Sequence, residues 1–409
     1  MRRIIFFLQR AIRMSAIAFI LGSSWARSEG STPQRQISAE KFEEIRKIAI
    51  QGNVVAQRKL ADCYFQGDGV SADHAEAVKW YRKAAEQGDI GAQYNLGSCY
   101  SSGHGMPQDY VEAAKWYRKA ADQGDADSQF YLGNCYHEGA GVVQNYATSV
   151  KWYLKAAQQD HALAQAALGN CYDNGEGLTQ DSAESVKWYR KSAEQGNATA
   201  QYNLGLCYTN VSGVRQDFAE AVKWYRKAAD QGHVKAQWNL GLCYFQGEGV
   251  AQDQAEAVKW YRKSAEQGDP DAQSNLGKCY YTGSGVPRNY SEAVKWFQKS
   301  AYQNNALAQS NLGICPYKGD GVTQNITEAA NQFRRAAEQG NTVAQWSLGL
   351  CYASGEGLLW DDVMAYMWWK LAAAQGNTDA IVKLDFISKR MTNAQIAEAQ
   401  RVSREWKKR

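Results

Sequence analysis

Residues 53–88, "NVVAQRKLADCYFQGDGVSADHAEAVKWYRKAAEQG", decide the fold of this chain. In each half of the stretch, apolar residues recur at the i, i+4, i+7 and i+8 spacing that places side chains on one face of an α-helix. They are Ala56, Leu60, Cys63 and Tyr64 in the first half, and Ala77, Tyr81, Ala84 and Ala85 in the second half. The stretch therefore predicts two amphipathic helices.

The two-helix pattern recurs nine times at a period of 36 residues between Asn53 and Gly376, without insertion or deletion. Asp or Asn precedes each second helix, where its side chain can accept hydrogen bonds from the free N–H groups of the first turn. Each second helix is followed by Gly, or by Asp160 or Asn304, and these residue types tolerate a left-handed backbone. A G-x-G segment such as Gly67–Gly69 separates the two helices of a unit. Because it follows a helix rather than a strand, it predicts a tight turn and not a phosphate-binding loop.

The repeat predicts an all-α solenoid with no strand. One two-helix unit cannot bury its apolar faces alone, whereas stacked units share a continuous core. We assign nine repeats to residues 53–376, an N-terminal covering helix to residues 38–52, and C-terminal covering helices to residues 377–409.

The first 26 residues differ in kind from the rest of the chain. They contain four arginines and no acidic residue, then an apolar run from Met14 to Leu21, then Ser24-Trp25-Ala26. This order predicts a secretory signal peptide, followed by a linker at residues 27–37. An uncleaved membrane anchor is the alternative. The four arginines account for the whole formal net charge of +4, so residues 27–409 are neutral overall and give no reason to expect nucleic-acid binding.

The pattern A-x-x-x-L-G-x-x-Y-x-x-G-x-G-V, followed by D-x-x-E-A-x-x-W-Y-x-x-A-A-x-x-G, resembles the Sel1-like repeat family, a branch of the tetratricopeptide-type helical solenoids. The resemblance implies a right-handed α/α superhelix whose first helices line a concave groove. It also implies scaffold or adaptor work on protein or peptide partners, as a monomer or within a multi-protein complex, in the periplasm or outside a bacterial cell. Pro316 departs from the family pattern, and we expect the helix that contains it to be kinked or shortened.

All nine cysteines lie on the 36-residue period, at 63, 99, 135, 171, 207, 243, 279, 315 and 351. One cysteine per unit cannot form a bridge within a unit. Equivalent helices of neighbouring units lie about 8–10 Å apart, too far for a disulfide. Zinc sites made from cysteines need closer spacing along the chain. We therefore expect buried reduced thiols that pack as small apolar residues.

The resemblance also implies an alternative function, because some members of the family act as β-lactamases or penicillin binders. The one S-x-x-K sequence, Ser38–Lys41, lacks its companion motifs and is better explained by Ser38 as a helix cap. The five histidines are scattered and predict no ligand or base cluster, with His161 and His233 at helix caps. Lys and Arg on the second helices predict a solvated face with local ion pairs. No catalytic residue, metal ligand or cofactor site is predicted.

Partner binding is assigned to a set of aromatic and asparagine side chains on the first helices. The set is Tyr94, Asn95, Tyr202, Asn203, Trp238, Asn239, Asn275, Asn311 and Trp346. Amides can pair with the backbone of an extended peptide, and rings can cover its side chains. In tetratricopeptide relatives, an asparagine before the Leu-Gly pair can hold a peptide. The alternative, of equal weight, is that the rings pack between units and the asparagines tie helices together.

Overall fold

The computed structural model describes residues 37–406. Within this range it contains 21 α-helices and no strand, which confirms the all-α solenoid fold. The predicted signal peptide, residues 27–36 of the predicted linker, and residues 407–409 lie outside the described residues. None of the described helices has the length and apolar character needed to cross a membrane.

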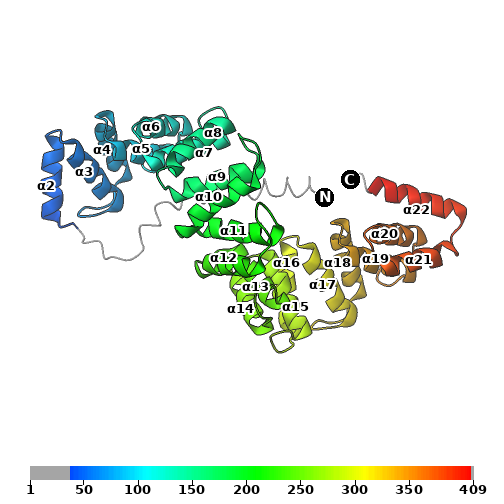
Figure 1. Ribbon diagram of the computed structural model, residues 1–409. Coiled ribbons are helices and arrows are strands. Elements are labelled where there is room, and N and C mark those ends of the chain that lie inside the picture. Colours follow the sequence, from blue (N-terminus) through cyan, green and yellow to red (C-terminus); the bar gives the residue numbers. More distant parts are fainter. Residues whose placement is uncertain (1–36, 407–409) are drawn as a thin grey trace. The chain divides into compact units, whose positions relative to one another are not determined.

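The chain divides into two compact units, of which the first ends at Ala200 and also includes Ser212–Val214. Each of its helices packs against the next one along the chain, as the blue to green helices of Figure 1 show. Its helices are α2 (Ala39–Ile50), α3 (Val54–Gln66), α4 (His74–Glu86), α5 (Ile90–Ser102), α6 (Tyr110–Asp122), α7 (Ala126–Glu138), α8 (Tyr146–Ala157), α9 (Ala162–Asn174) and α10 (Ser182–Glu194).

The second unit comprises Gln201–Val211 and the chain from Arg215 onward. From α12 to α21 each helix packs against the next one along the chain, and α20 also contacts the final helix α22. α11 (Ala198–Asn210) spans the boundary between the units, and the second unit continues with α12 (Phe218–Asp230), α13 (Val234–Gln246), α14 (Gln254–Glu266), α15 (Pro270–Thr282), α16 (Tyr290–Tyr302), α17 (Ala306–Lys318), α18 (Ile326–Glu338), α19 (Thr342–Ser354), α20 (Asp362–Ala373), α21 (Thr378–Ser388) and α22 (Asn393–Trp406).

The predicted helix ends are confirmed. Asp or Asn caps every second helix of the nine repeats, as where Asp253 accepts a hydrogen bond from the Glu256 N–H at 2.9 Å. Ser38 caps α2 by accepting from the Lys41 N–H, which is the role predicted for it. Asp160 and Asn304 adopt the left-handed backbone, with φ of 59° and 60°. Local capping chemistry therefore sets the length of each helix.

The G-x-G turn is confirmed as a structural feature, and its second glycine has two reasons to be glycine. Gly321 has a φ of +74°, and a Cβ there would lie 2.6 Å from the carbonyl carbon of Tyr290 in the preceding repeat. Such a distance is too short for any side chain, so the turn places one repeat directly on the backbone of the one before. In the fifth repeat Val211 replaces the first glycine and is held at a φ of 58°, which is strained for a β-branched residue.

The helix that contains Pro316 is not shortened, because α17 has the same 13 residues as most first helices of the repeats, and the alternative of a kink stays a prediction. Pro316 lies in the last turn, so its missing N–H removes only one hydrogen bond of the helix. Its carbonyl still accepts from the Asn325 N–H at 2.9 Å, as the carbonyl of Tyr64 accepts from Asp73 at 2.8 Å. The following turn is therefore retained.

Candidate functional site

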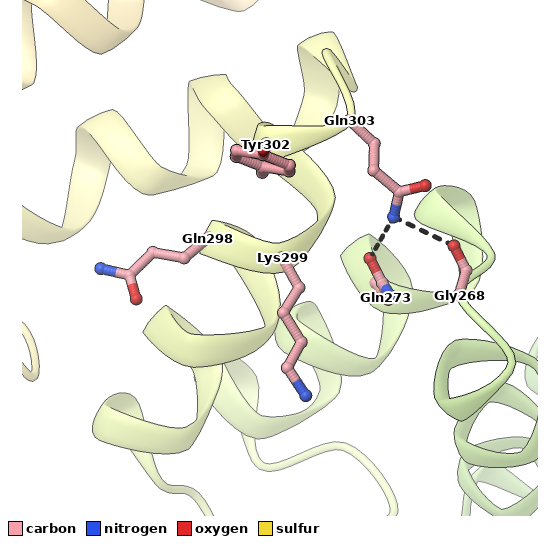
Figure 2. Close-up of a pocket in the computed structure, with 6 residues that line it drawn as sticks. All are labelled: Gly268, Gln273, Gln298, Lys299, Tyr302 and Gln303. Carbon is pink, nitrogen blue, oxygen red and sulfur yellow. Dashed lines mark hydrogen bonds between the residues drawn. The ribbon is translucent and has the colours of Figure 1, made fainter.

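Paired glutamines join consecutive helices along both units. Gln273 of α15 donates its side-chain amide to the Ala265 carbonyl of α14 at 3.1 Å. Gln303, at the end of α16, donates to Gln273 Oε1 at 2.9 Å and to the Gly268 carbonyl at 3.0 Å (Figure 2). The same pairing joins Gln57 to Gln87, Gln93 to Gln123, Gln129 to Gln159, Gln165 to Gln195, Gln201 to Gln231, Gln237 to Gln267, Gln309 to Gln339 and Gln345 to Gln375.

We call these paired glutamines the glutamine lattice. The pattern of apolar residues did not predict it, although the position of the glutamines in the repeat could have indicated it. Glutamine stands four residues after the cap of the first helix in all nine repeats, next to a buried alanine in eight of them and next to Ser128 in the third. A polar residue kept at such a position needs a hydrogen-bonding partner inside the structure. The surface hollow of Figure 2 is lined by Gln273, Gln303, Lys299 and Tyr302 among others, and the amides of its two paired glutamines are already used by the lattice.

The outer face of the second helices carries the predicted local ion pairs. Lys79 lies 2.7 Å from Glu76 on the same helix, and Lys83 Nζ lies 4.0 Å from the ring centroid of Trp80. Glu76 also accepts from the Trp80 indole N–H at 3.1 Å. In the eighth repeat Gln332 replaces the tryptophan and donates to Glu328 at 2.6 Å, as Trp80 does to Glu76 in the first repeat.

In the first unit, the predicted site residues Tyr94 and Asn95 are half-buried on α5. The Tyr94 ring centroid lies 6.1 Å from that of Tyr117 and 5.8 Å from that of Tyr131, and burial raises the pKa of Tyr94. Asn95 donates to Asp62 Oδ1 on α3 at 3.4 Å. These are the contacts that the packing alternative predicts, and partner binding by the two residues stays a prediction.

In the second unit, side chains of the fifth and sixth repeats form one cluster. Tyr202 of α11 stacks on His233, with ring centroids 4.7 Å apart. Lys235 of α13 lies 5.4 Å from the ring centroid of Trp238. The Asn239 side chain donates to the Lys235 carbonyl at 3.0 Å. Tyr202, Trp238 and Asn239 are each half-buried, so all three keep some exposed surface. We call Tyr202, His233, Lys235, Trp238 and Asn239 the central cluster.

Charge in the central cluster is balanced by the next repeat. Lys235 Nζ lies 2.6 Å from Asp269 Oδ2 and 3.1 Å from Asp271 Oδ2. Asp269 is only 4% exposed and caps α15, so it needs this cation nearby. Burial alone would lower the pKa of Lys235, but its hydrogen bonds and attraction to the two aspartates raise it overall. Burial raises the pKa of Tyr202, against the opposing effects of Lys235 and Asn239.

The remaining predicted site residues occupy equivalent positions on other first helices. Asn203, Asn275, Asn311 and Trp346 are all half-buried. The Trp346 carbonyl accepts from the Trp369 indole N–H at 3.1 Å, and its own indole N–H is buried without a partner. The Trp238 indole N–H is likewise buried without a partner. These rings therefore contribute mainly apolar surface.

All nine cysteines lie among the described residues and are buried, and no disulfide joins any two of them. Burial raises the pKa of Cys243 to about 11 and that of Cys99 to about 12. A thiol with such a pKa is protonated at neutral pH and is a poor nucleophile. The predicted packing role of the cysteines is therefore confirmed.

His137 is not as isolated as the scattered spacing of the histidines suggested, and whether it binds a metal stays a prediction. Its Nε2 lies 3.0 Å from Glu176 Oε2, and Cys171 Sγ belongs to the same group, with all three ligand atoms within 4.8 Å of one another. Cys171 and Glu176 belong to the repeat that follows that of His137, and they lie 34 and 39 positions from it along the chain. Spacing along the chain hid the group because stacking, not sequence proximity, brings its members together.

A sequence model of the Sel1 repeat matches nine consecutive segments of the chain. They are residues 54–89, 90–125, 126–161, 162–197, 198–233, 234–269, 270–305, 306–341 and 342–377. This chain belongs to the Sel1 repeat family. The matched segments begin one residue after the repeat boundaries assigned from the sequence. Solenoids of Sel1 repeats typically act as scaffolds for protein–protein interaction.

Two solved structures of Sel1 repeat proteins resemble this one. The crystal structure of c5321, a protective antigen present in uropathogenic Escherichia coli strains displaying an SLR fold, has 39% sequence identity and a TM-score of 0.83, covering 95% of this chain and 83% of that chain. A Sel1 repeat protein from Oxalobacter formigenes has 33% identity and a TM-score of 0.57, covering 76% of this chain and 89% of that chain. A search of curated proteins found no match.

Proposed function

We propose that this Sel1 repeat protein is an exported scaffold that binds an extended segment of a partner protein on its first-helix face. One observation carries the proposal: in the second unit, consecutive repeats place Tyr202, Trp238 and Asn239 together on a partly exposed surface. Rings there can cover apolar side chains, and the amide can pair with a peptide backbone. The set predicted from the sequence adds Asn203, Asn275, Asn311 and Trp346 in the same unit. Tyr94 and Asn95 would form a separate surface in the first unit.

The glutamine lattice supports this choice of face. It holds each first helix to its neighbours through buried amides, so the rings and asparagines rest on a rigid support. A preorganised surface loses less conformational entropy when a partner binds. By contrast, the lysines of the second-helix face are occupied by glutamates of their own helices, as for Lys223 with Glu220.

The test is partner capture with matched surface variants. Purified protein would be used to capture partners from an envelope extract, with identification by mass spectrometry. A captured partner would then be titrated against the double variant Trp238→Ala with Asn239→Ala, and against Tyr202→Ala with Asn203→Ala. We expect each to weaken binding by more than about tenfold, while circular dichroism shows unchanged helicity. Lys223→Ala, on the opposite face, is the control and should bind normally. Equal binding by all three would assign the interaction elsewhere.

Export rests on the first 26 residues, with their four arginines, apolar run and small residues at 24 and 26. We propose periplasmic or secreted localisation on that basis. Fractionation followed by mass spectrometry should recover a chain whose N-terminus lies near Arg27. Recovery of only the full-length chain, and only from the cytosol, would contradict export.

No observation favours the alternative of a β-lactam hydrolase. The Ser38 hydroxyl, the only candidate nucleophile of an S-x-x-K sequence, is occupied as the cap of α2. We expect no hydrolysis of a chromogenic β-lactam above the buffer rate.

A further inference from the structure

Three side chains with different metal-binding atoms converge between the third and fourth repeats. His137 extends from the last turn of α7, Cys171 from the last turn of α9, and Glu176 from the turn that follows α9. His137 Nε2 and Glu176 Oε2 lie 3.0 Å apart, and Cys171 Sγ completes a group within 4.8 Å. The Glu176 N–H donates to the Cys171 carbonyl at 3.0 Å, so the turn holds the carboxylate and the thiol in a fixed relation.

We propose that His137, Cys171 and Glu176 form a zinc-binding site. Imidazole nitrogen, thiolate sulfur and carboxylate oxygen are the three ligand types that Zn²⁺ takes in proteins. Tetrahedral zinc with ordinary bond lengths would separate its ligand atoms by about 3.3–3.8 Å, so the observed group needs only small side-chain movements to close on an ion. Three protein ligands would leave the fourth position for water or for a group from another molecule.

The exposure of the three side chains and the orientation of the His137 ring would allow an ion to enter from solvent. The side chains of His137 and Glu176 are 27% and 22% exposed, whereas Cys171 is only 1% exposed. The ion would therefore be held between two surface ligands and one buried ligand. The rings of Tyr146 and Tyr153 lie with centroids 5.0 Å and 6.4 Å from that of His137, and they limit the orientations of the imidazole.

The rest of the chain offers an internal comparison. The same geometric position in later repeats pairs Tyr281 with Asp320 at 2.6 Å, and Tyr317 with Glu356 at 3.1 Å. Each of these turns also follows a buried cysteine, Cys315 or Cys351. A neutral phenol is a much weaker zinc ligand than an imidazole, and its hydroxyl already donates to the carboxylate. The turns after Cys171, Cys315 and Cys351 therefore each combine a carboxylate with a nearby thiol. Among these three turns, only the first also has an imidazole beside it, that of His137.

Zinc must compete with a proton at the thiol. Zinc takes a cysteine as thiolate, so the Cys171 thiol must lose its proton when the ion binds. We therefore expect affinity to rise with pH and a proton to be released on binding. Both effects separate a thiolate ligand from weak binding to surface carboxylates.

The test is titration of the full chain, stripped of metal with a chelator, with Zn²⁺ alone by calorimetry. We expect the chain to bind one ion and to release a proton for each ion bound. Bound zinc should also raise the midpoint of unfolding. Co²⁺ as a spectroscopic substitute should give a thiolate-to-cobalt charge-transfer band. His137→Ala and Glu176→Gln should each lower zinc affinity by more than about tenfold, the loss expected even for an outer-shell partner. Asp320→Asn, at the matched turn with Tyr281, is the control and should leave affinity and stoichiometry unchanged.

Cys171→Ala should abolish the cobalt charge-transfer band. If Cys171→Ala does not fold, the proposal is tested by the charge-transfer band of the unmodified chain and by its loss in His137→Ala. His137 is partly exposed, so we expect that variant to fold. No saturable binding by the unmodified chain, or no charge-transfer band with cobalt bound, would overturn the proposal. An equal loss of affinity in Asp320→Asn would overturn it as well.

Discussion

Gln303 donates its side-chain amide to Gln273 Oε1 across 2.9 Å. The Gln273 side-chain N–H in turn donates to the Ala265 carbonyl, so the buried amide of Gln273 links α14, α15 and α16. The glutamine pair recurs within every repeat, and the first glutamine of the pair also bonds the preceding repeat within each unit, as Gln273 does with Ala265 and Gln237 does with Ala229. The stability of the solenoid should therefore depend on glutamines that a hydrophobicity pattern ignores.

Replacing Gln273 by leucine should lower the free energy of unfolding by about 1–3 kcal/mol. The substitution leaves the buried Ala265 carbonyl without its partner and removes the acceptor of the Gln303 amide. The measurement is the denaturant midpoint followed by circular dichroism. Gln298→Leu, at an exposed position of α16, is the control and should change stability by less than about 0.5 kcal/mol. Similar midpoints for the two variants would show that the lattice adds little.

Val211→Gly should stabilise the chain by about 1 kcal/mol. Val211 holds a φ of 58°, where a β-branched residue is strained and glycine is not, and its side chain is 60% exposed, so little packing is lost. The reverse change at the matched position of the fourth repeat, Gly175→Val, should destabilise the chain. Thermal unfolding of both variants checks the prediction. A lower midpoint for Val211→Gly would mean that the valine makes contacts worth more than its strain.

Acid should destabilise the second unit through His233. Its Nδ1 accepts from the Ala236 N–H as the cap of α13, which requires a neutral ring, and burial lowers the pKa of His233 to about 4. Because the unfolded chain titrates near the ordinary value of about 6.5, it binds more protons below that pH. Stability is therefore complete above about pH 6.5 and is lost as the pH falls toward 4, by up to roughly 3 kcal/mol.

The control for this titration is His233→Asn. Asparagine caps the same position of α17 and α19, through Asn305 and Asn341, and cannot titrate. The variant should lose the part of the pH dependence that belongs to His233, whatever its stability at neutral pH. Unfolding midpoints between pH 4 and 7 measure both chains. Identical slopes in the two chains would place the acid sensitivity at other groups.

The nine thiols should resist a water-soluble thiol reagent in the native state and should all react in denaturant. They are buried, and the pKa of Cys243 is raised to about 11, so little thiolate exists at neutral pH. Cys243→Ser should cost about 1–3 kcal/mol, because it places a hydroxyl on a packed apolar face. Fewer than nine thiols after unfolding without reductant would reveal disulfides.

Much of the fold could be predicted from particular residues. The capping aspartates and asparagines, the left-handed Asp160 and Asn304, and the burial of the cysteines all follow from chemistry within a few residues of each position. The candidate partner-binding residues could be named from the sequence, but not their surroundings. Tyr202 stacks on His233, and Lys235 forms an ion pair with Asp269, and both contacts join side chains of neighbouring repeats. The helix at Pro316 is not shortened, because its place in the last turn makes the lost hydrogen bond unimportant.

The sequence by itself determined the helices, their ends and the period of the repeat, because helix periodicity and capping act over one or two turns of chain. Only the tertiary structure decided which side chains from distant helices meet, within a repeat and across repeats. The 30-residue separation of Gln273 and Gln303, and the 39-residue separation of His137 and Glu176, carry no signal in a local pattern. Those contacts exist because stacking brings positions about one repeat apart to within a few ångströms, and so the stabilising lattice and the candidate zinc site emerge only from the folded chain.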